Sequence, residues 1–295
     1  MGHSVKATQA RLQVLLAALL FSTGGAGIKA AAFSGVQVSA LRSGIAAIVL
    51  AVVFRGQLNM SWPVLRVGVV YGATLTLFVL STKLTTAANA IFLQATAPLY
   101  LQILSPMLLG ERFTKRDILY LAGIAVGLAF CVAGRPPATT TAPNPTLGNL
   151  LGVLCSMVWA LTLLGLRHLE RDARRQGSAM AAVVAGNALA SLVALPFAWP
   201  LPMASVLEWA TIGYLGTFQI ALAYVFLTRA VRRLPAFEVS LLLLLEPVLN
   251  PAWTWAIRGE HPGTWTIMGG AVIIAVTAIK SLYETYEDRT VRAIV

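Results

Sequence analysis

The chain has 295 residues, of which 58% are hydrophobic and 11% are charged. Ordinary soluble domains carry about 25% charged residues, so this composition, with a mean hydropathy of +0.77, excludes a soluble globular protein and indicates an integral membrane protein. The formal net charge of +11 would indicate a nucleic-acid-binding protein only if the basic residues formed one patch on a soluble surface.

Apolar windows follow one another along the whole chain, each about 17 to 22 residues long and therefore able to cross a hydrocarbon core of about 30 Å as a helix. Ten can be drawn, at 12–30, 36–54, 64–82, 87–109, 117–134, 147–166, 179–198, 206–228, 236–257 and 264–283. Since nine more follow it, the first is expected to be a retained span and not a cleaved signal peptide. The predicted fold class is an all-α integral membrane protein with ten transmembrane helices.

Basic residues are concentrated at both termini and in alternate connections between these windows. The opposite side has only Lys29, Lys83, Arg135 and Arg258, and Arg42 lies inside the second window. By the positive-inside rule, both termini are expected in the cytoplasm of a cell whose inner (plasma) membrane holds this multi-pass protein. The positive charge then contacts anionic lipid headgroups, not nucleic acid. Lys29 and Lys83 are expected to snorkel to the outer surface.

The second half of the sequence repeats the first. The segment APLYLQILSPMLLGE at 97–111 aligns with EPVLNPAWTWAIRGE at 246–260, and a shorter match joins 21–29 to 159–167. The matched positions pair Pro98 with Pro247, Gly110 with Gly259, Glu111 with Glu260, Phe21 with Trp159, and Lys29 with Arg167. Each copy contains five windows, an odd number, so the second copy must enter the membrane with the opposite polarity. The sequence therefore predicts two inverted five-helix repeats.

The repeat also predicts the domain boundaries. Residues 1–134 form the first repeat, and residues 147–295 form the second repeat with a short cytoplasmic tail. Between them, RPPATTTAPNPT at 135–146 is a Pro/Thr-rich segment typical of an exposed linker, expected on the periplasmic side.

The two aligned blocks, together with GTFQIALAY at 216–224 and Leu234-Pro235-Ala236, resemble the ten-helix EamA-type permeases of the drug/metabolite transporter superfamily. The resemblance covers nearly the whole chain. Members of that family include bacterial exporters of amino acids and other small metabolites, so the resemblance implies an inner-membrane carrier without specifying its substrate. Gln219, inside the 216–224 block, is accordingly a candidate substrate-binding residue.

Glu246 is an acidic residue inside an apolar window, where a charge costs about 2.5–3.5 kcal/mol unless it faces a partner or water. On a helix, Glu246, Asn250 and Trp253 share one face. We expect that face to line the bundle interior and to bind substrate or a proton. The alternative is a structural ion pair between Glu246 and Arg42.

Prolines interrupt windows 4 and 9 at equivalent places. Pro98, Pro106, Pro247 and Pro251 each remove a backbone donor, which membrane helices tolerate where other groups satisfy the freed carbonyls. Paired broken helices in the two halves of a transporter indicate a midplane binding site. We therefore expect these prolines to be helix breaks that line or gate the site, with packing kinks as the alternative.

Further candidates are polar or aromatic residues inside spans. Gln94, Gln102 and Ser105 share one face of a continuous helix, with Thr96 and Tyr100 beside it; this stripe indicates either a cavity or interhelical hydrogen bonds. Phe21, Trp159 and Tyr224 are candidates for an aromatic lining, or for simple packing. Glu111 and Glu260 are expected to cap loops at the interface, with gating as the alternative. GxxxG spacings at 68–72, 123–127 and 148–152 indicate close helix packing within the bundle.

The function that these observations favour is secondary transport by alternating access, around a cavity bounded by spans 1, 3, 4, 6, 8 and 9. A small neutral or aromatic amino acid is the leading substrate, and a broad exporter of organic cations or other metabolites is the alternative. A membrane receptor or structural protein is the alternative from another class. The chain has no HExxH, GxSxG or phosphate-binding loop, and its Cys and His residues lack ligand spacing, so we expect no enzyme activity, no metal and no cofactor.

Overall fold

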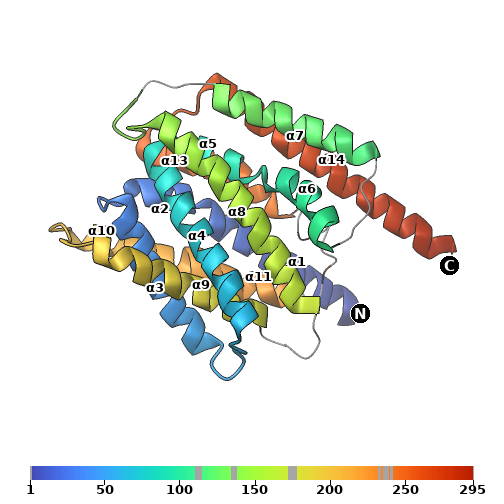
Figure 1. Ribbon diagram of the computed structural model, residues 1–295, viewed down its shortest axis with the longest axis horizontal. Helices are drawn as coiled ribbons and strands as arrows, with labels where there is room; N and C mark the ends of the chain where they lie inside the picture. Colours follow the sequence, from blue (N-terminus) through green and yellow to red (C-terminus); the bar gives the residue numbers. More distant parts are fainter. Residues whose placement is uncertain are drawn as a thin grey trace.

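The computed structural model describes residues 2–109, 115–133, 138–171, 178–231, 234, 239 and 242–294. In these residues every regular element is a helix, and no strand occurs among them (Figure 1). The first half of the chain contains α1 (Gly2–Ser22), α2 (Gly24–Ala30), α3 (Gly35–Val53), α4 (Trp62–Leu84), α5 (Ala87–Gln94), α6 (Ala97–Leu109) and α7 (Lys115–Ala133). The second half contains α8 (Pro145–Arg171), α9 (Ser178–Ala194), η2 (Leu195–Phe197), α10 (Val206–Tyr214), η3 (Leu215–Leu222), α11 (Ala223–Val231), α13 (Leu245–Arg258) and α14 (Thr264–Ile294).

The helices follow the order of the predicted spans. Helical stretches long and apolar enough to cross a membrane occur at 8–30, 35–53, 62–84, 87–104, 145–166, 178–197 and 206–230. Shorter apolar helices at 118–133 and 264–280 occupy the fifth and tenth predicted windows, and α13 lies in the ninth. The prediction of an all-α membrane protein is therefore confirmed.

Span 4 and span 9 are interrupted at equivalent residues of the repeat. The turn between α5 and α6 has Ala95 at φ −65°, ψ −8°, and the residue before α13, Leu244, has φ −61°, ψ −14°. Each turn lies three residues before a proline, Pro98 or Pro247. A proline ring crowds the carbonyl four residues earlier and cannot bond to it, so the helix breaks just ahead of the proline.

Spans 1 and 8 are also irregular, although the sequence predicted each as one helix. Span 1 is divided at Thr23 into α1 and α2, directly before Gly24 and Gly25. Span 8 passes from α10 through a π-helical segment, η3, into α11. π-Helical turns are rare and often occur at functional sites. Gln219 lies in that segment.

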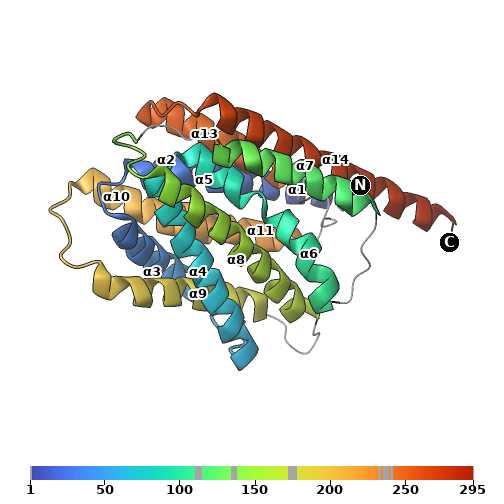
Figure 2. The ribbon, with the colours of Figure 1, turned by 45° about the horizontal axis from the view of Figure 1, so that its top comes forward.

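The helix contacts between the two halves follow one pattern, which is unchanged when each span is replaced by its repeat counterpart. In span numbers, span 3 (α4) packs on spans 6 and 7 (α8 and α9), and its counterpart span 8 (η3 and α11) packs on spans 1 and 2. Span 4 packs on span 6, and its counterpart span 9 packs on span 1. The pairs α3 with α9 and α7 with α14 are their own counterparts, the latter lying side by side in Figures 1 and 2. Both chain ends lie at the same end of the molecule in these views.

Small residues allow the closest helix contacts. Gly68 and Gly72 of α4 lie against Ala185 and Gly186 of α9, and a Cβ atom at Gly72 would be only 2.8 Å from the Gly186 carbonyl oxygen. Tyr71, between the two glycines in sequence, is buried at the same contact. The GxxxG spacing at 68–72 therefore serves packing within the chain, as predicted.

Substituting Gly72→Ala is expected to lower the melting temperature of the purified protein, because backbone atoms of α9 would have to shift to admit the methyl group. Overpacking of this kind costs about 1–3 kcal/mol. Gly213→Ala is the matched control, since a Cβ atom there meets nothing within 4 Å; it should leave the melting temperature unchanged or slightly higher. Thermal unfolding in detergent measures both, and equal effects of the two substitutions would contradict the close approach of α4 and α9.

Candidate transport site

Four aromatic rings from four helices form a continuous chain in the bundle interior. Phe21 of α1 and Tyr224 of α11 have ring centroids 5.3 Å apart. Tyr224 contacts Tyr71 of α4 at 6.0 Å, and Tyr71 contacts Trp159 of α8 at 6.3 Å. The structure thus brings together the three aromatic residues predicted from sequence. Tyr71 links Trp159 to the other two rings. It was not predicted from the sequence, although it is the lone tyrosine of its apolar window.

Arg42 of α3 is a buried cation beside these rings. Its side chain is 2% exposed, and its guanidinium group interacts electrostatically with Tyr71, Tyr224 and Cys155. Nη2 donates a long hydrogen bond of 3.5 Å to the Leu75 carbonyl, whereas Nε and Nη1 have no hydrogen-bond partner within the described part of the chain. Two unsatisfied donors on a buried charge are costly. Arg42 is therefore equipped to receive an anionic group.

Glu246 lies in the first turn of α13 and is half-buried. Its carboxylate acts electrostatically on the Tyr224 hydroxyl, as Arg42 does from another helix. Among the described residues no ion pair joins Glu246 to Arg42, so the structural pairing considered as an alternative is absent here. The reason is topological: Arg42 is on α3, which packs on α4, α9 and η3, whereas α13 packs on α1, α2 and α5. Arg42 and Glu246 thus both act electrostatically on Tyr224 but form no ion pair with each other among the described residues.

Two buried amides lie against the break in span 1. A Cβ atom at Gly24 would be 2.8 Å from Gln219 Nε2, and one at Gly25 would collide with Asn250 Oδ1. Both amide atoms of Asn250, and Oε1 of Gln219, have no hydrogen-bond partner in the residues that the structure describes. The GGAG sequence at 24–27 therefore allows the amides of Gln219 in η3 and Asn250 in α13 to lie against the α2 backbone. This glycine-rich sequence could have predicted the break in span 1.

The same junction is held by two side-chain hydrogen bonds. Trp253 Nε1 donates to Ser22 Oγ at 3.0 Å, and the hydroxyl groups of Thr23 and Tyr214 are 2.9 Å apart. Asn250 and Trp253 thus both face span 1, as the shared helix face predicted. These contacts join the end of α1 to α13, and the break at Thr23 to the end of α10.

The polar stripe predicted for span 4 is wrong as drawn, because the helix does not continue through it. α5 ends at Gln94, and α6 begins at Ala97, so the eight-residue spacing from Gln94 to Gln102 does not define one face. Gln94, Tyr100 and Gln102 are each half-buried. Thr96, in the break, donates to the Leu93 carbonyl at 2.6 Å, and its Oγ1 lies 3.2 Å from Ser156 Oγ of α8.

The four prolines do not all break helices. Pro98 and Pro247 lie in the first turns of α6 and α13, directly after the two equivalent turns. Pro251 is inside α13, which continues to Arg258, so its prediction as a break is wrong. Pro106 is also inside a helix, α6, and its side chain and that of Ser105 lie outside those described. The breaks are therefore placed by the first proline of each block.

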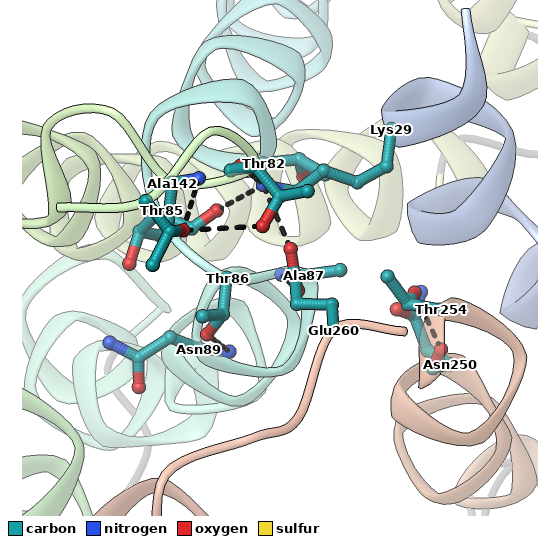
Figure 3. Close-up of polar contacts among 12 residues, drawn as sticks. Lys29, Thr82, Thr85, Thr86, Ala87, Asn89, Ala142, Asn250, Thr254 and Glu260 are labelled. Atoms are coloured by element: carbon teal, nitrogen blue, oxygen red, sulfur yellow. Dashed lines mark hydrogen bonds and ion pairs between the residues drawn. The ribbon is translucent and has the colours of Figure 1, made fainter. Parts of the chain in front are cut away.

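The predictions for Lys29 and Lys83 are also wrong. Neither side chain snorkels: Lys29 forms a buried ion pair of 3.2 Å with Glu260 (Figure 3), and half-buried Lys83 donates to the Ala31 carbonyl at 2.6 Å. Snorkelling requires a side chain at the lipid boundary, whereas the chain itself covers these two. Glu260 does cap a neighbouring segment, as expected, but in a buried setting; Glu111 lies outside the described residues.

Comparison with known proteins agrees with this architecture. Residues 9–133 and 146–282 each match the EamA-like transporter family. A solved crystal structure that covers 94% of this chain, and is itself covered over 97%, has the same fold, with a TM-score of 0.63 and 23% identity.

Two named relatives each match a smaller share of this chain than the solved structure does. The pseudopaline exporter CntI of Pseudomonas aeruginosa is 28% identical over 189 residues, which is 63% of this chain and 63% of that protein. The uncharacterized transporter YyaM of Bacillus subtilis is 22% identical over 254 residues, 82% of this chain and 83% of YyaM. With both halves matched by one family, and the membrane fold and paired breaks in place, the chain belongs to the EamA-like transporter family.

Proposed function

We propose that this carrier exports a neutral or aromatic amino acid across the inner membrane by alternating access. The observation that carries the proposal is that buried Arg42 has two nitrogen atoms without a hydrogen-bond partner and forms no ion pair with Glu246 among the described residues, so both opposite charges remain available to a ligand. A zwitterion presents a carboxylate and an ammonium group that complement such an arrangement.

The chemistry of each residue suits a part of that substrate. A guanidinium group recognises a carboxylate through two parallel N–H donors, and Arg42 has two donors to spare. Glu246 would accept the ammonium group, and the rings of Phe21, Tyr71 and Tyr224 would contact an apolar or aromatic side chain. Substrate contacts would then offset the cost of burying both charges.

The inverted halves supply the mechanism of movement. Because helix contacts exchange when the halves are swapped, an inward-facing and an outward-facing state could be built from the same two packings. The half-helices α2, α5 and α13 would shift about the fixed aromatic chain. We assign both termini to the cytoplasm on the distribution of basic residues.

A second candidate is export of organic cations. It is favoured by a carboxylate, Glu246, beside aromatic faces, which is a common way to bind quaternary or lipophilic cations. The relative named as a pseudopaline exporter supports export as the direction, and a larger metabolite as a further substrate to test. Flux from proteoliposomes against an amino-acid panel, with lipophilic cations as competitors, separates these candidates. Absence of flux of any metabolite from folded protein would favour a non-transporting receptor or structural role.

Glu246→Gln is expected to reduce amino-acid flux by about tenfold or more while leaving membrane insertion intact, because a charge-assisted contact to the ammonium group is lost. The matched control is Glu208→Gln. Glu208 is in an exposed capping box with Ser205, and a glutamine can make the same capping contacts. Wild-type flux in Glu246→Gln would remove Glu246 from the site.

Arg42→Gln is expected to abolish the preference for an amino acid over the corresponding amine that lacks the carboxylate. The wild-type protein should take up the amino acid with a KM lower by about tenfold or more, since a paired guanidinium contact contributes on that scale. Arg66→Gln, at an exposed arginine above Trp62, is the control. A variant at Arg42 that still prefers the amino acid would show that the carboxylate binds elsewhere.

Asn250→Ala is expected to leave the melting temperature unchanged or raised, because both amide atoms that it removes lack partners in the folded protein. The same variant should lose flux if the amide binds substrate. Gly25→Ala, by contrast, should lower the melting temperature, since its methyl group would collide with Asn250, and Asn250→Ala should restore it in the double variant. Melting and flux measured on the same preparations test this; a strongly destabilised Asn250→Ala would instead indicate a packing role.

A further inference from the structure

Four connecting segments of the chain meet at one end of the bundle, which we call the linker end. They follow α2, α4 and α13 or precede α8, and they include the described residues 138–144 of the predicted linker. At their centre, Lys29 Nζ and Glu260 Oε2 are 3.2 Å apart, with side chains only 2% and 5% exposed. This ion pair lies at the end of span 1, covered by the chain itself, and it is not part of the site described above.

Lys29 joins three segments by itself. Besides Glu260, its ammonium group donates to the Thr85 carbonyl at 2.6 Å and to the Thr141 carbonyl. An ammonium group has three donors; two of them are used by these carbonyl groups, and the charge is balanced by the ion pair with Glu260. The end of span 1, the connection after span 3, the linker and the connection after span 9 are thereby held together (Figure 3).

Glu260 joins a further element. Its second oxygen, Oε1, accepts a hydrogen bond of 2.6 Å from the backbone N–H of Ala87, the first residue of α5. A carboxylate at a helix N-terminus satisfies a free donor and interacts favourably with the helix dipole. The chain can present Glu260 in this way because Gly259, at φ +64°, ends α13 in the left-handed conformation that glycine adopts most readily.

The pair also lies directly beyond the transport site. Lys29 is one helical turn along α2 from Gly25, which contacts Asn250. Glu260 follows α13, whose Asn250 and Thr254 point toward the same region in Figure 3. The ion pair therefore ties together the linker ends of α2, α5 and α13, whose other ends are the breaks in spans 1, 4 and 9.

The contacts at the linker end depend on the negative charge of Glu260, because the neighbouring ionisable groups are cations. Lys29, Lys83 and Arg258 repel one another electrostatically, and Glu260 forms an ion pair with one of these three cations, Lys29. Removing the negative charge would leave like charges to repel each other across the closed end. A buried ion pair is also suited to reversible opening, because hydration of the separated charges offsets much of the attraction lost.

We propose that the Lys29–Glu260 pair is the lock that closes the linker end of this carrier, and that its separation gives the transport site access to that side of the membrane. The inference deepens the proposed function, since a lock is needed only if the site opens alternately. By the orientation proposed from basic residues, the locked end is the outer one, and the described conformation is closed to the outside.

Accessibility of a reporter cysteine tests the lock without using any substrate. Cys131 and Cys155, both buried and free, are replaced by alanine, and Thr254→Cys places a thiol on α13 between Asn250 and Glu260. A membrane-impermeant maleimide is then added to intact cells, and separately to inside-out vesicles. Thr254 is buried, with 1% exposure, so labelling from the linker side should be slow in the otherwise wild-type protein.

Glu260→Gln and Lys29→Met are each expected to raise the labelling rate from the linker side by about tenfold or more, because each leaves a buried charge without its partner. The double variant should increase labelling by less than the product of the two single effects. Lys83→Met is the matched control: it removes a neighbouring lysine that bonds a carbonyl but belongs to no ion pair in the described residues. Glu111→Gln changes the repeat counterpart of Glu260, and it should not raise labelling from this side.

Variants that melt at lower temperature but label at the wild-type rate would show that the pair only stabilises the fold, and would overturn the lock. So would equal increases for Lys83→Met and Glu260→Gln. Flux assays of the same variants keep the two proposals separate. If the lock variants label at the wild-type rate while the wild-type protein transports substrate, only the lock is refuted. If the variants label faster but the wild-type protein transports nothing, the proposed transport activity is refuted and the closure is retained.

Discussion

A backbone group that is freed inside a membrane must find a partner within the protein, because the hydrocarbon offers none. That constraint explains where this chain is irregular. The turns at Thr23, Ala95 and Leu244 lie in spans that contact one another, since α2 packs on α13 and both pack on α5. Interruptions that would be intolerable against lipid are thus collected at one place in the interior, where amides, hydroxyl groups and helix ends from several spans are close together.

Much of the fold was predictable because its signals are local. Apolar length predicted the spans, and the first proline of each aligned block predicted the equivalent turns before α6 and α13. The break at Thr23 was missed because a glycine-rich segment has no proline and retains the hydropathy of a helix. The span 4 stripe failed for a related reason: helical spacing was extended across a turn, and the face that it defined does not exist.

The candidate site was predictable in its residue types but not in its partners. Phe21 and Tyr224 contact each other directly, but Tyr71 links Trp159 to them, and the place of Tyr71 depends on how α4 packs between α8 and α9. Lys29 was misassigned because a lysine near a span end looks the same in sequence whether lipid or protein surrounds it. Only the arrangement of connections after α4 and before α8 decides that it is covered. Long-range packing is the information that a single sequence lacks.

The two halves share a contact pattern but not every detail, and the differences coincide with the polar residues. Span 1 is broken at Thr23, whereas its repeat counterpart in span 6 is the continuous helix α8. Span 8 contains a π-helical segment, whereas its counterpart α4 is regular. The irregular partners of both pairs, spans 1 and 8, are the ones that bring Gly24 and Gln219 into contact. Under the proposed function, the symmetric scaffold would provide the movement, and local departures from its symmetry would provide the recognition.

The buried polar groups at the linker end and in the centre of this protein have different partners. At the linker end Lys29 donates to two carbonyl groups and forms an ion pair with Glu260, whose Oε1 accepts from a helix N-terminus. Glu260 Oε2 takes part in the ion pair but has no hydrogen-bond partner among the described residues. In the centre, Arg42, Asn250 and Gln219 hold donors and acceptors that no described residue satisfies. Buried charges in a closure are stabilised by partners within the protein, whereas a binding site gains affinity and specificity from groups that its ligand satisfies. The ion pair at the linker end therefore supports the proposed lock, and the unpartnered groups of Arg42, Asn250 and Gln219 support the proposed substrate site.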